Sequence, residues 1–162
     1  MQGDVELIKM NILKPAVYVD ADACPVKDEI IEICQEYQVD MIFVSSYAHQ
    51  LTIPAPAKVV TVDSDKEAAD LYVMNHIKIG DVCVTQDHAL ASILLPKRTV
   101  VLSPRGIEYD ESKMEQMLDA RFVSAKQRRM GKRTKGPKPF SKDDRERFKR
   151  NFEKIIAEKA GI

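Results

Sequence analysis

The sequence has little of what marks secreted or membrane proteins. Its three cysteines are an odd number without a CxxC pair, which argues against a disulfide framework and against a zinc cluster. No apolar run approaches the roughly 20 residues of a membrane span. The acidic residues 1–6 lack the basic-then-apolar pattern of a secretory signal. We therefore expect a cytoplasmic globular protein with no membrane partner.

The length and composition fit a small folded protein. With 162 residues, of which 44% are hydrophobic, the chain is long enough for one domain with a sizeable core. We expect an N-terminal extension at 1–14 and an α/β domain at 15–130. Residues 131–162 are expected to form a basic loop and a C-terminal helix that packs on the same domain.

Strand and helix signals alternate along the chain. Apolar, β-branched runs predict strands at 16–20, 41–45, 58–62, 82–85 and 99–102. Helical spacing predicts helices at 26–37, 64–77, 89–94, 112–130 (an amphipathic one) and 141–160. Ser64 with Glu67, and Ser141 with Asp144, fit capping boxes. This alternation predicts a central, mostly parallel five-stranded sheet covered by helices on both faces.

The most informative segment is Val17-Tyr18-Val19-Asp20-Ala21-Asp22-Ala23-Cys24-Pro25, in which a buried strand runs into two carboxylates. The carboxyl end of a strand is where open α/β sheets bind ligands. Two carboxylates held this close repel each other, so they need a cation, a shared proton or a shifted pKa. The alternative is that they only cap the next helix, although one such residue would suffice.

Two more carboxylates are expected at the same edge of the sheet. Asp87 follows the strand at 82–85, and Asp70 lies in the helix after the third strand, with Asp63 and Asp65 as reserve candidates. Singly, Asp87 also fits a helix cap and Asp70 a solvated helix face. Together, oxygen ligands without histidine favour Mg²⁺ or Mn²⁺ over zinc.

Further motifs follow in order: Ala69-Asp70, Val84-Thr85-Gln86-Asp87, Ser103-Pro104-Arg105-Gly106 and Gly136-Pro137. With the first segment they resemble the YaiI/YqxD family of bacterial proteins, which is related to PIN-like nuclease domains, over about residues 16–160. The resemblance implies a PIN-like three-layer fold. It also implies a site at Asp20, Asp22, Asp70 and Asp87, with Thr85 as a hydroxyl neighbour. PIN nucleases often use a Glu on the second helix, where this chain has Asp70, or Glu67 one turn earlier.

Charge is distributed unevenly. Residues 1–120 hold ten Lys and Arg against twenty Asp and Glu, a net charge of −10, whereas residues 121–150 hold thirteen against three, a net charge of +10. Such asymmetry is typical of polyanion binding. The expected phosphate contacts are Arg128, Arg129, Lys132, Arg133 and Lys135, with Phe140 as an aromatic neighbour. Arg105 either binds a substrate phosphate or neutralises the acidic edge. The basic run is otherwise a solvated face, or it folds back onto the acidic body.

These patterns predict a Mg²⁺- or Mn²⁺-dependent nuclease or phosphodiesterase acting on nucleic acid, with RNA favoured. One alternative is a non-catalytic RNA-binding or regulatory module. Another is a haloacid-dehalogenase-type phosphatase with Asp20 as nucleophile, although Lys97 precedes its strand and matches that family poorly. Cys24, beside a helix N-terminus, is either a reactive thiol or, as we prefer among these acids, a packing or capping residue.

Overall fold

The computed structural model describes residues 14–47, 52–54, 56–131 and 138–161. Nearly all of the expected N-terminal extension, and most of the basic loop with Lys132, Arg133 and Lys135, lie outside the described residues. The strands are β1 (Ala16–Asp20), β2 (Asp40–Ser46), β3 (Lys58–Val62), β4 (Val82–Val84) and β5 (Val100–Leu102). The helices are α2 (Lys27–Glu36), α3 (Lys66–His76), α4 (His88–Leu94), the 3₁₀ turn η1 (Leu95–Lys97), α5 (Glu111–Arg129) and α6 (Lys142–Lys159).

The five strands form one sheet in the order β3-β2-β1-β4-β5, and every neighbouring pair is parallel. The chain builds the sheet outward from β1, first toward β3 and then, from β4, in the other direction. This reversal places the topological switch point between β1 and β4, where open α/β sheets bind ligands. The expected α/β fold with a parallel five-stranded sheet is confirmed.

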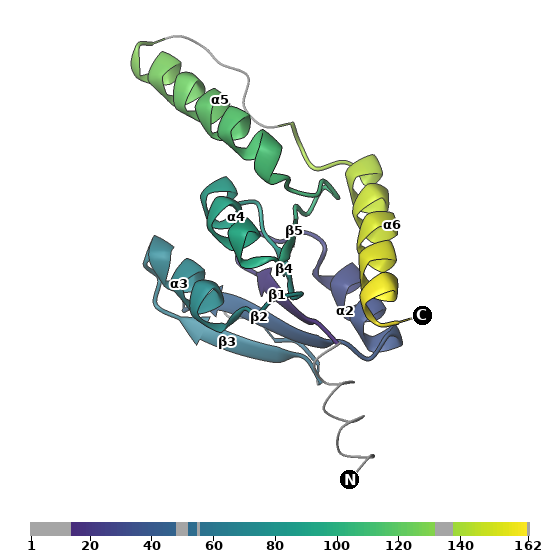
Figure 1. Cartoon of the computed structure of the whole chain (residues 1–162). Coiled ribbons are helices and arrows are strands. Elements are labelled where there is room, and N and C mark those ends of the chain that lie inside the picture. The colour runs from purple at the N-terminus through teal and green to yellow at the C-terminus, as the bar shows by residue number, and fades with distance from the viewer. Residues whose placement is uncertain (1–13, 48–51, 55, 132–137, 162) are drawn as a thin grey trace.

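Helices cover both faces of the sheet, because side chains of one strand alternate between the faces. Val17 and Val19 of β1 are fully buried in a cluster shared with α2 and α6. Tyr18, between them, faces the opposite cluster, which is shared with α3, α4 and the start of α5. Figure 1 shows α2 and α6 on one side of the sheet and α3 and α4 on the other. The molecule therefore has the expected three layers.

Helix α6 is anchored by an apolar stripe and by the loop after β5. Phe148, Phe152 and Ile156 recur every four residues and are fully buried. Gly106 has φ +85°, and a Cβ there would lie 2.5 Å from the backbone nitrogen of Phe148. Asn151 Nδ2 donates a 2.7 Å hydrogen bond to the Gly106 carbonyl. The Ser103-Pro104-Arg105-Gly106 segment thus holds α6 against the sheet.

The helix ends show where local patterns succeed and fail. Ser141 and Asp144 form the expected capping box of α6. For α3, Asp65 rather than Ser64 is the N-cap, and its carboxylate accepts from the Glu67 amide at 3.5 Å. The helix expected over 112–130 is present as α5, but its amphipathic character is not confirmed. Among the described side chains of α5, Met114 alone is buried.

Candidate acidic site

Asp20 and Thr85 meet across the switch point. Val19 of β1 is level with Val84 of β4, so the next residue of each strand leaves the sheet at the same edge. The Thr85 hydroxyl donates a 3.0 Å hydrogen bond to Asp20 Oδ2 and accepts one of 3.0 Å from the Asp87 amide. Burial raises the pKa of Asp20, and the charges of Asp22 and Asp87 raise it further, while the Thr85 hydrogen bond lowers it. A buried hydroxyl therefore connects two of the expected acids.

Asp70 and Asp87 come from different helices and interact with each other. Asp87 caps α4, with Oδ1 accepting from the amides of Ala89 at 2.9 Å and Leu90 at 3.2 Å. Partial burial raises the pKa of Asp70 to about 6, and the charges of Asp87 and Asp20 add to the effect. A side-chain hydrogen bond with Asp87 also favours protonated Asp70. The cap expected for Asp87 is present, but it does not exclude a role in the cluster.

Asp22 is held by the end of β2. The parallel register places Asp20 beside Val44, so the residues that follow are opposite Ser45 and Ser46. Asp22 Oδ1 accepts from the Ser45 hydroxyl at 3.1 Å and from the Ser46 amide at 3.0 Å. Ser45 and Ser46 were not among the site residues expected from the sequence, although they end a strand at the same edge of the sheet. Asp22 adds negative charge to the cluster while its carboxylate binds β2.

The arrangement is a cluster of like charges rather than a closed metal cage. Within the described part of the chain, no three acidic, histidine or cysteine side chains lie close enough to enclose an ion. The chemistry of the donors still fits a hard dication, because all of them are carboxylate oxygens. Burial chiefly raises the pKa of Asp70, and repulsion from Asp87 and Asp20 raises it further. Mg²⁺ often binds through one or two carboxylates and keeps several waters. Asp20, Asp70 and Asp87 are the residues that would hold it.

Of the expected substrate-binding cations, the three in the described part of the chain (Arg105, Arg128 and Arg129) form no ion pair with Asp20, Asp70 or Asp87. The guanidinium of Arg105 forms a 2.9 Å ion pair with Asp144 and hydrogen bonds with the carbonyls of Lys138 and Pro139. Its carboxylate partner therefore lies at the start of α6, and this ion pair is neither of the two roles expected for Arg105. Arg128 and Arg129 are exposed in the last turn of α5. Their contact with phosphate stays a prediction.

Two residues singled out in the sequence belong to the packing. Cys24 is buried, and burial raises the pKa of its thiol to about 11, so the reactive alternative is not supported. Phe140 packs against the apolar cluster under α6, and the guanidinium carbon of Arg145 lies 5.2 Å from its ring centroid. The ring of Phe140 therefore packs within the protein, against the core and the Arg145 guanidinium.

The position of Lys97 argues against the phosphatase alternative. It precedes β5, at the amino edge of the sheet, and its Nζ donates a 3.2 Å hydrogen bond to the Met74 carbonyl. The cluster lies at the opposite, carboxyl edge. Lys97 is therefore not placed to bind a phosphate on Asp20.

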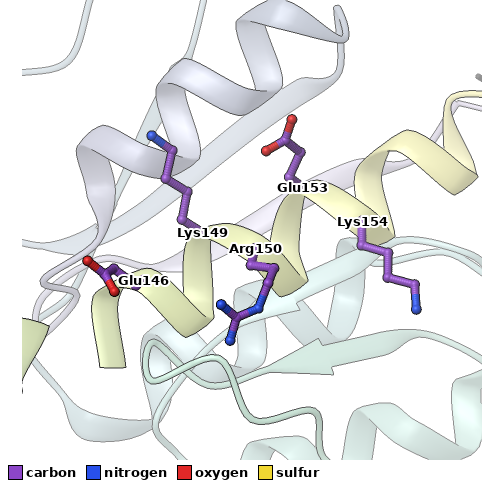
Figure 2. Close-up of a pocket in the computed structure, with 5 residues that line it drawn as sticks. All are labelled: Glu146, Lys149, Arg150, Glu153 and Lys154. Carbon is purple, nitrogen blue, oxygen red and sulfur yellow. The ribbon is translucent and has the colours of Figure 1, made fainter. Parts of the chain in front are cut away.

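A pocket of about 470 Å³ lies along α6, away from the acidic cluster. It is lined by Glu146, Lys149, Arg150, Glu153 and Lys154. Figure 2 shows Lys149 and Glu153 on one side of α6 and Arg150 and Lys154 on the other. Lys149 Nζ lies 4.0 Å from Glu32 Oε1 of α2, and Tyr37 donates to Glu153 at 3.4 Å. These contacts mainly join α6 to α2.

Residues 18–158 match the family model described as "Uncharacterized BCR, YaiI/YqxD family". The chain belongs to the YaiI/YqxD family. A UPF0178 protein of Halalkalibacterium halodurans is 54% identical over 146 residues, which cover 90% of this chain and 93% of that protein.

Other relatives of this YaiI/YqxD protein are also named UPF0178 proteins. A UPF0178 protein of Shouchella clausii is 54% identical over 132 residues, covering 82% of this chain and 86% of that protein. One from Listeria monocytogenes is 50% identical over 135 residues, covering 83% and 92%. No solved structure matches the chain. In the structure of this family member, no helix among the described residues combines the length and apolar character that membrane crossing requires.

Proposed function

We propose that this protein is a Mg²⁺- or Mn²⁺-dependent phosphodiesterase that hydrolyses nucleic acid, with RNA favoured over DNA. The observation that carries the proposal is the meeting of Asp20, Asp70 and Asp87, from β1, α3 and the start of α4, at the switch point of the sheet. Fold stability does not require this meeting, because each extra carboxylate adds repulsion there.

The chain holds these carboxylates in place through hydroxyl and amide donors. Thr85 fixes Asp20, the first turn of α4 fixes Asp87, and the end of β2 fixes Asp22. Among the described residues, no Lys or Arg forms an ion pair with Asp20, Asp70 or Asp87. A site ready to accept positive charge is left at the edge where ligands bind in such folds.

A dication bound there would polarise a phosphoryl oxygen and lower the pKa of a bound water. Within the protein itself, burial raises the pKa of Asp20, and the hydrogen bond from Thr85 opposes that rise. Asp70, with a pKa of about 6 in the metal-free protein, would give up its proton when a dication binds, because the added positive charge favours the carboxylate. These properties fit a set of carboxylates that would hold a dication beside a phosphodiester.

The test is cleavage of end-labelled single-stranded RNA by purified protein, with Mn²⁺ or Mg²⁺ and with EDTA. We expect cleavage that needs the metal and falls at least 100-fold in Asp20→Asn and Asp70→Asn, because each removes a group that acts on the reacting phosphate. Asp63→Asn is the matched control, since Asp63 is exposed beyond β3 and outside the cluster. Cleavage that resists EDTA, or that survives in Asp20→Asn, would contradict the proposal.

The second candidate is a non-catalytic nucleic-acid-binding module. The exposed basic residues Lys126, Arg128 and Arg129 of α5 favour this candidate. Their side chains could bind phosphates without any contribution from the acidic cluster. Salt-sensitive binding of RNA without cleavage in Mn²⁺ would decide for this candidate.

A further inference from the structure

Most of the described side chains of helix α5 are exposed. The helix packs against α4 near its start, and Figure 1 shows its C-terminal part projecting away from the sheet. In that part Phe122 is 63% exposed, although a large aromatic side chain gains most from burial. The described fold gives no packing reason for an aromatic residue at this position.

Phe122 shares one face of α5 with two cations. Lys126 and Arg129 follow it by four and seven residues, the spacing of neighbours along a helix surface, and both are exposed. Asp119 is the last acid of the helix, and every charged residue of α5 after it is basic. We call Phe122, Lys126 and Arg129 the α5 stripe.

The cations of the stripe differ from those that hold the fold together. Arg145 and Arg147 of α6 form ion pairs with Glu29 at 2.7 Å and Asp144 at 3.0 Å. In the described part of the chain, neither Lys126 nor Arg129 forms an ion pair. The alternative in which the basic residues fold back onto the acidic body therefore does not hold for these two. The helix dipole accounts for basic residues in a last turn, but not for the exposed ring.

An exposed ring next to unpaired cations is the combination that recognises a single-stranded polynucleotide. A base stacks on the aromatic ring while the cations contact the phosphates on either side. A duplex satisfies the cations equally well, but its bases are already stacked and do not offer a free face. A second copy of the chain on the same stripe would bring like charges together, which disfavours self-association.

We infer that the α5 stripe is an accessory binding surface for single-stranded nucleic acid, with Phe122 stacking on a base. The inference rests on the proposed function, since it names the form of the polymer that the acidic site would act on. At 1.5 Å per residue, Arg129 lies ~27 Å along the helix from Glu111. The stripe therefore contacts a part of the strand remote from the scissile phosphate.

The test is binding of the full chain to a fluorescein-labelled 16-residue oligouridylate and to a labelled RNA duplex, by fluorescence anisotropy in EDTA. We expect Phe122→Leu, which keeps an apolar side chain, to weaken single-strand binding about 5–150-fold, equivalent to the ~1–3 kcal/mol of one stacked base. Duplex binding should stay unchanged. Val123→Ala is the matched control, because Val123 is 50% exposed on an adjacent face.

The paired variant Lys126→Gln/Arg129→Gln should weaken both complexes. It should also lower the salt slope for the single strand by about 1.4, the value for two lost phosphate contacts. If Phe122→Leu and the unsubstituted chain bind the single strand with equal affinity, the inference is overturned. It is also overturned if Phe122→Leu loses as much affinity for the duplex as for the single strand. A dimer in sedimentation that Phe122→Leu converts to monomer would instead assign the stripe to self-association and overturn it too.

These outcomes are separable from those of the proposed function. Binding in EDTA involves no metal, and cleavage in Mn²⁺ reports on the acidic cluster. Stripe-dependent binding without cleavage would leave the inference standing and remove the nuclease proposal. Metal-dependent cleavage together with unchanged single-strand binding by Phe122→Leu would support the proposed function and overturn the inference about the α5 stripe.

Discussion

The Thr85 hydroxyl donates to Asp20 Oδ2 across the boundary between β4 and β1, and Thr85 is fully buried. The hydroxyl oxygen of Thr85 also accepts a hydrogen bond from the Asp87 amide. One side chain thus sets the position of Asp20 and of the backbone that carries Asp87. The integrity of the acidic cluster depends on this hydroxyl.

Thr85→Val tests that dependence. The substitution keeps the shape but leaves Asp20 and the Asp87 amide without this partner, so unfolding free energy in urea should fall by about 1–3 kcal/mol. Loss of the hydrogen bond raises the pKa of Asp20 further, and Mn²⁺ affinity by calorimetry should fall about 10–100-fold. Thr85→Ser, which keeps the hydroxyl, should restore most of both. Unchanged Mn²⁺ binding in Thr85→Val would separate Thr85 from the site.

Asp70→Asn should stabilise the metal-free protein at neutral pH. The folded pKa of Asp70 is about 6 against an ordinary value of 3.8, so the folded state holds this proton more tightly than the unfolded state. Its contribution to stability is greatest below pH 3.8 and is lost as the pH rises through 6. Because the carboxyl is partly exposed, we expect a modest Tm increase of about 1–4 °C at pH 8 in EDTA.

The same variant should behave differently in two other conditions. Near pH 4, where wild-type Asp70 is protonated, the Tm difference should shrink toward zero. With Mg²⁺ or Mn²⁺ present, the wild type should gain Tm and Asp70→Asn should not. Calorimetric scans of both proteins check this, and a variant less stable than wild type at pH 8 in EDTA would refute the electrostatic cause.

Gly106→Ala should loosen α6. The added Cβ meets the backbone of α6 at 2.5 Å, and φ +85° is strained for alanine, so we expect a loss of roughly 2–5 kcal/mol in urea unfolding. Gly80→Ala is the matched control, because Gly80 has φ +87° with nothing within 4 Å of the new Cβ. If both variants lose the same stability, backbone strain alone acts and the contact with α6 is unimportant.

Asp144→Asn should make the start of α6 weaker in a pH-dependent way. The Ser141 amide, chiefly, and the nearby Arg147 and Arg105 hold the pKa of Asp144 below its usual value. A lowered pKa gives stability that is present above about pH 3.8 and lost as the pH falls through the folded pKa. Wild type should therefore have the higher Tm at pH 6–8, and the difference should narrow below pH 3.8. A difference independent of pH would show that the carboxylate charge does not contribute.

Much of the fold was predictable because strands and helices here are locally encoded. The apolar runs predict all five strands to within one residue at each end, and the helices expected between most of them favour parallel pairing. Because parallel strands end at one edge of a sheet, the sequence alone places Asp20 and Asp87 at the same edge. Asp70 was harder to place, since the position of a helix over a sheet depends on packing.

The errors arise where tertiary contacts decide. Ser64 and Asp65 are both good caps, and local sequence does not choose between them. Helix α5 shows that a mixed apolar and charged segment need not bury a face in the described fold. For aromatic residues, the sequence pointed to Phe140 in the basic loop, whereas Phe140 is packed and Phe122 is exposed. Solvent exposure is set by neighbours that are remote in the chain.

Arg105 illustrates the same limit in charge pairing. Its position after β5 indicated the acidic edge, but its ion pair is with Asp144, 39 residues later in the sequence. Only the docking of α6 on the sheet makes that partner available. The sequence left a substrate phosphate and the acidic edge open as partners of Arg105, and it did not point to Asp144.

The central claim is that side-chain anions from β1, α3 and α4 together bind a dication. The most direct measurement is an anomalous difference map from crystals of the full chain soaked in Mn²⁺. The account predicts a peak within coordination distance of carboxylate oxygens from at least two of Asp20, Asp70 and Asp87. A map with Mn²⁺ bound elsewhere, and no peak at these three residues, would contradict it.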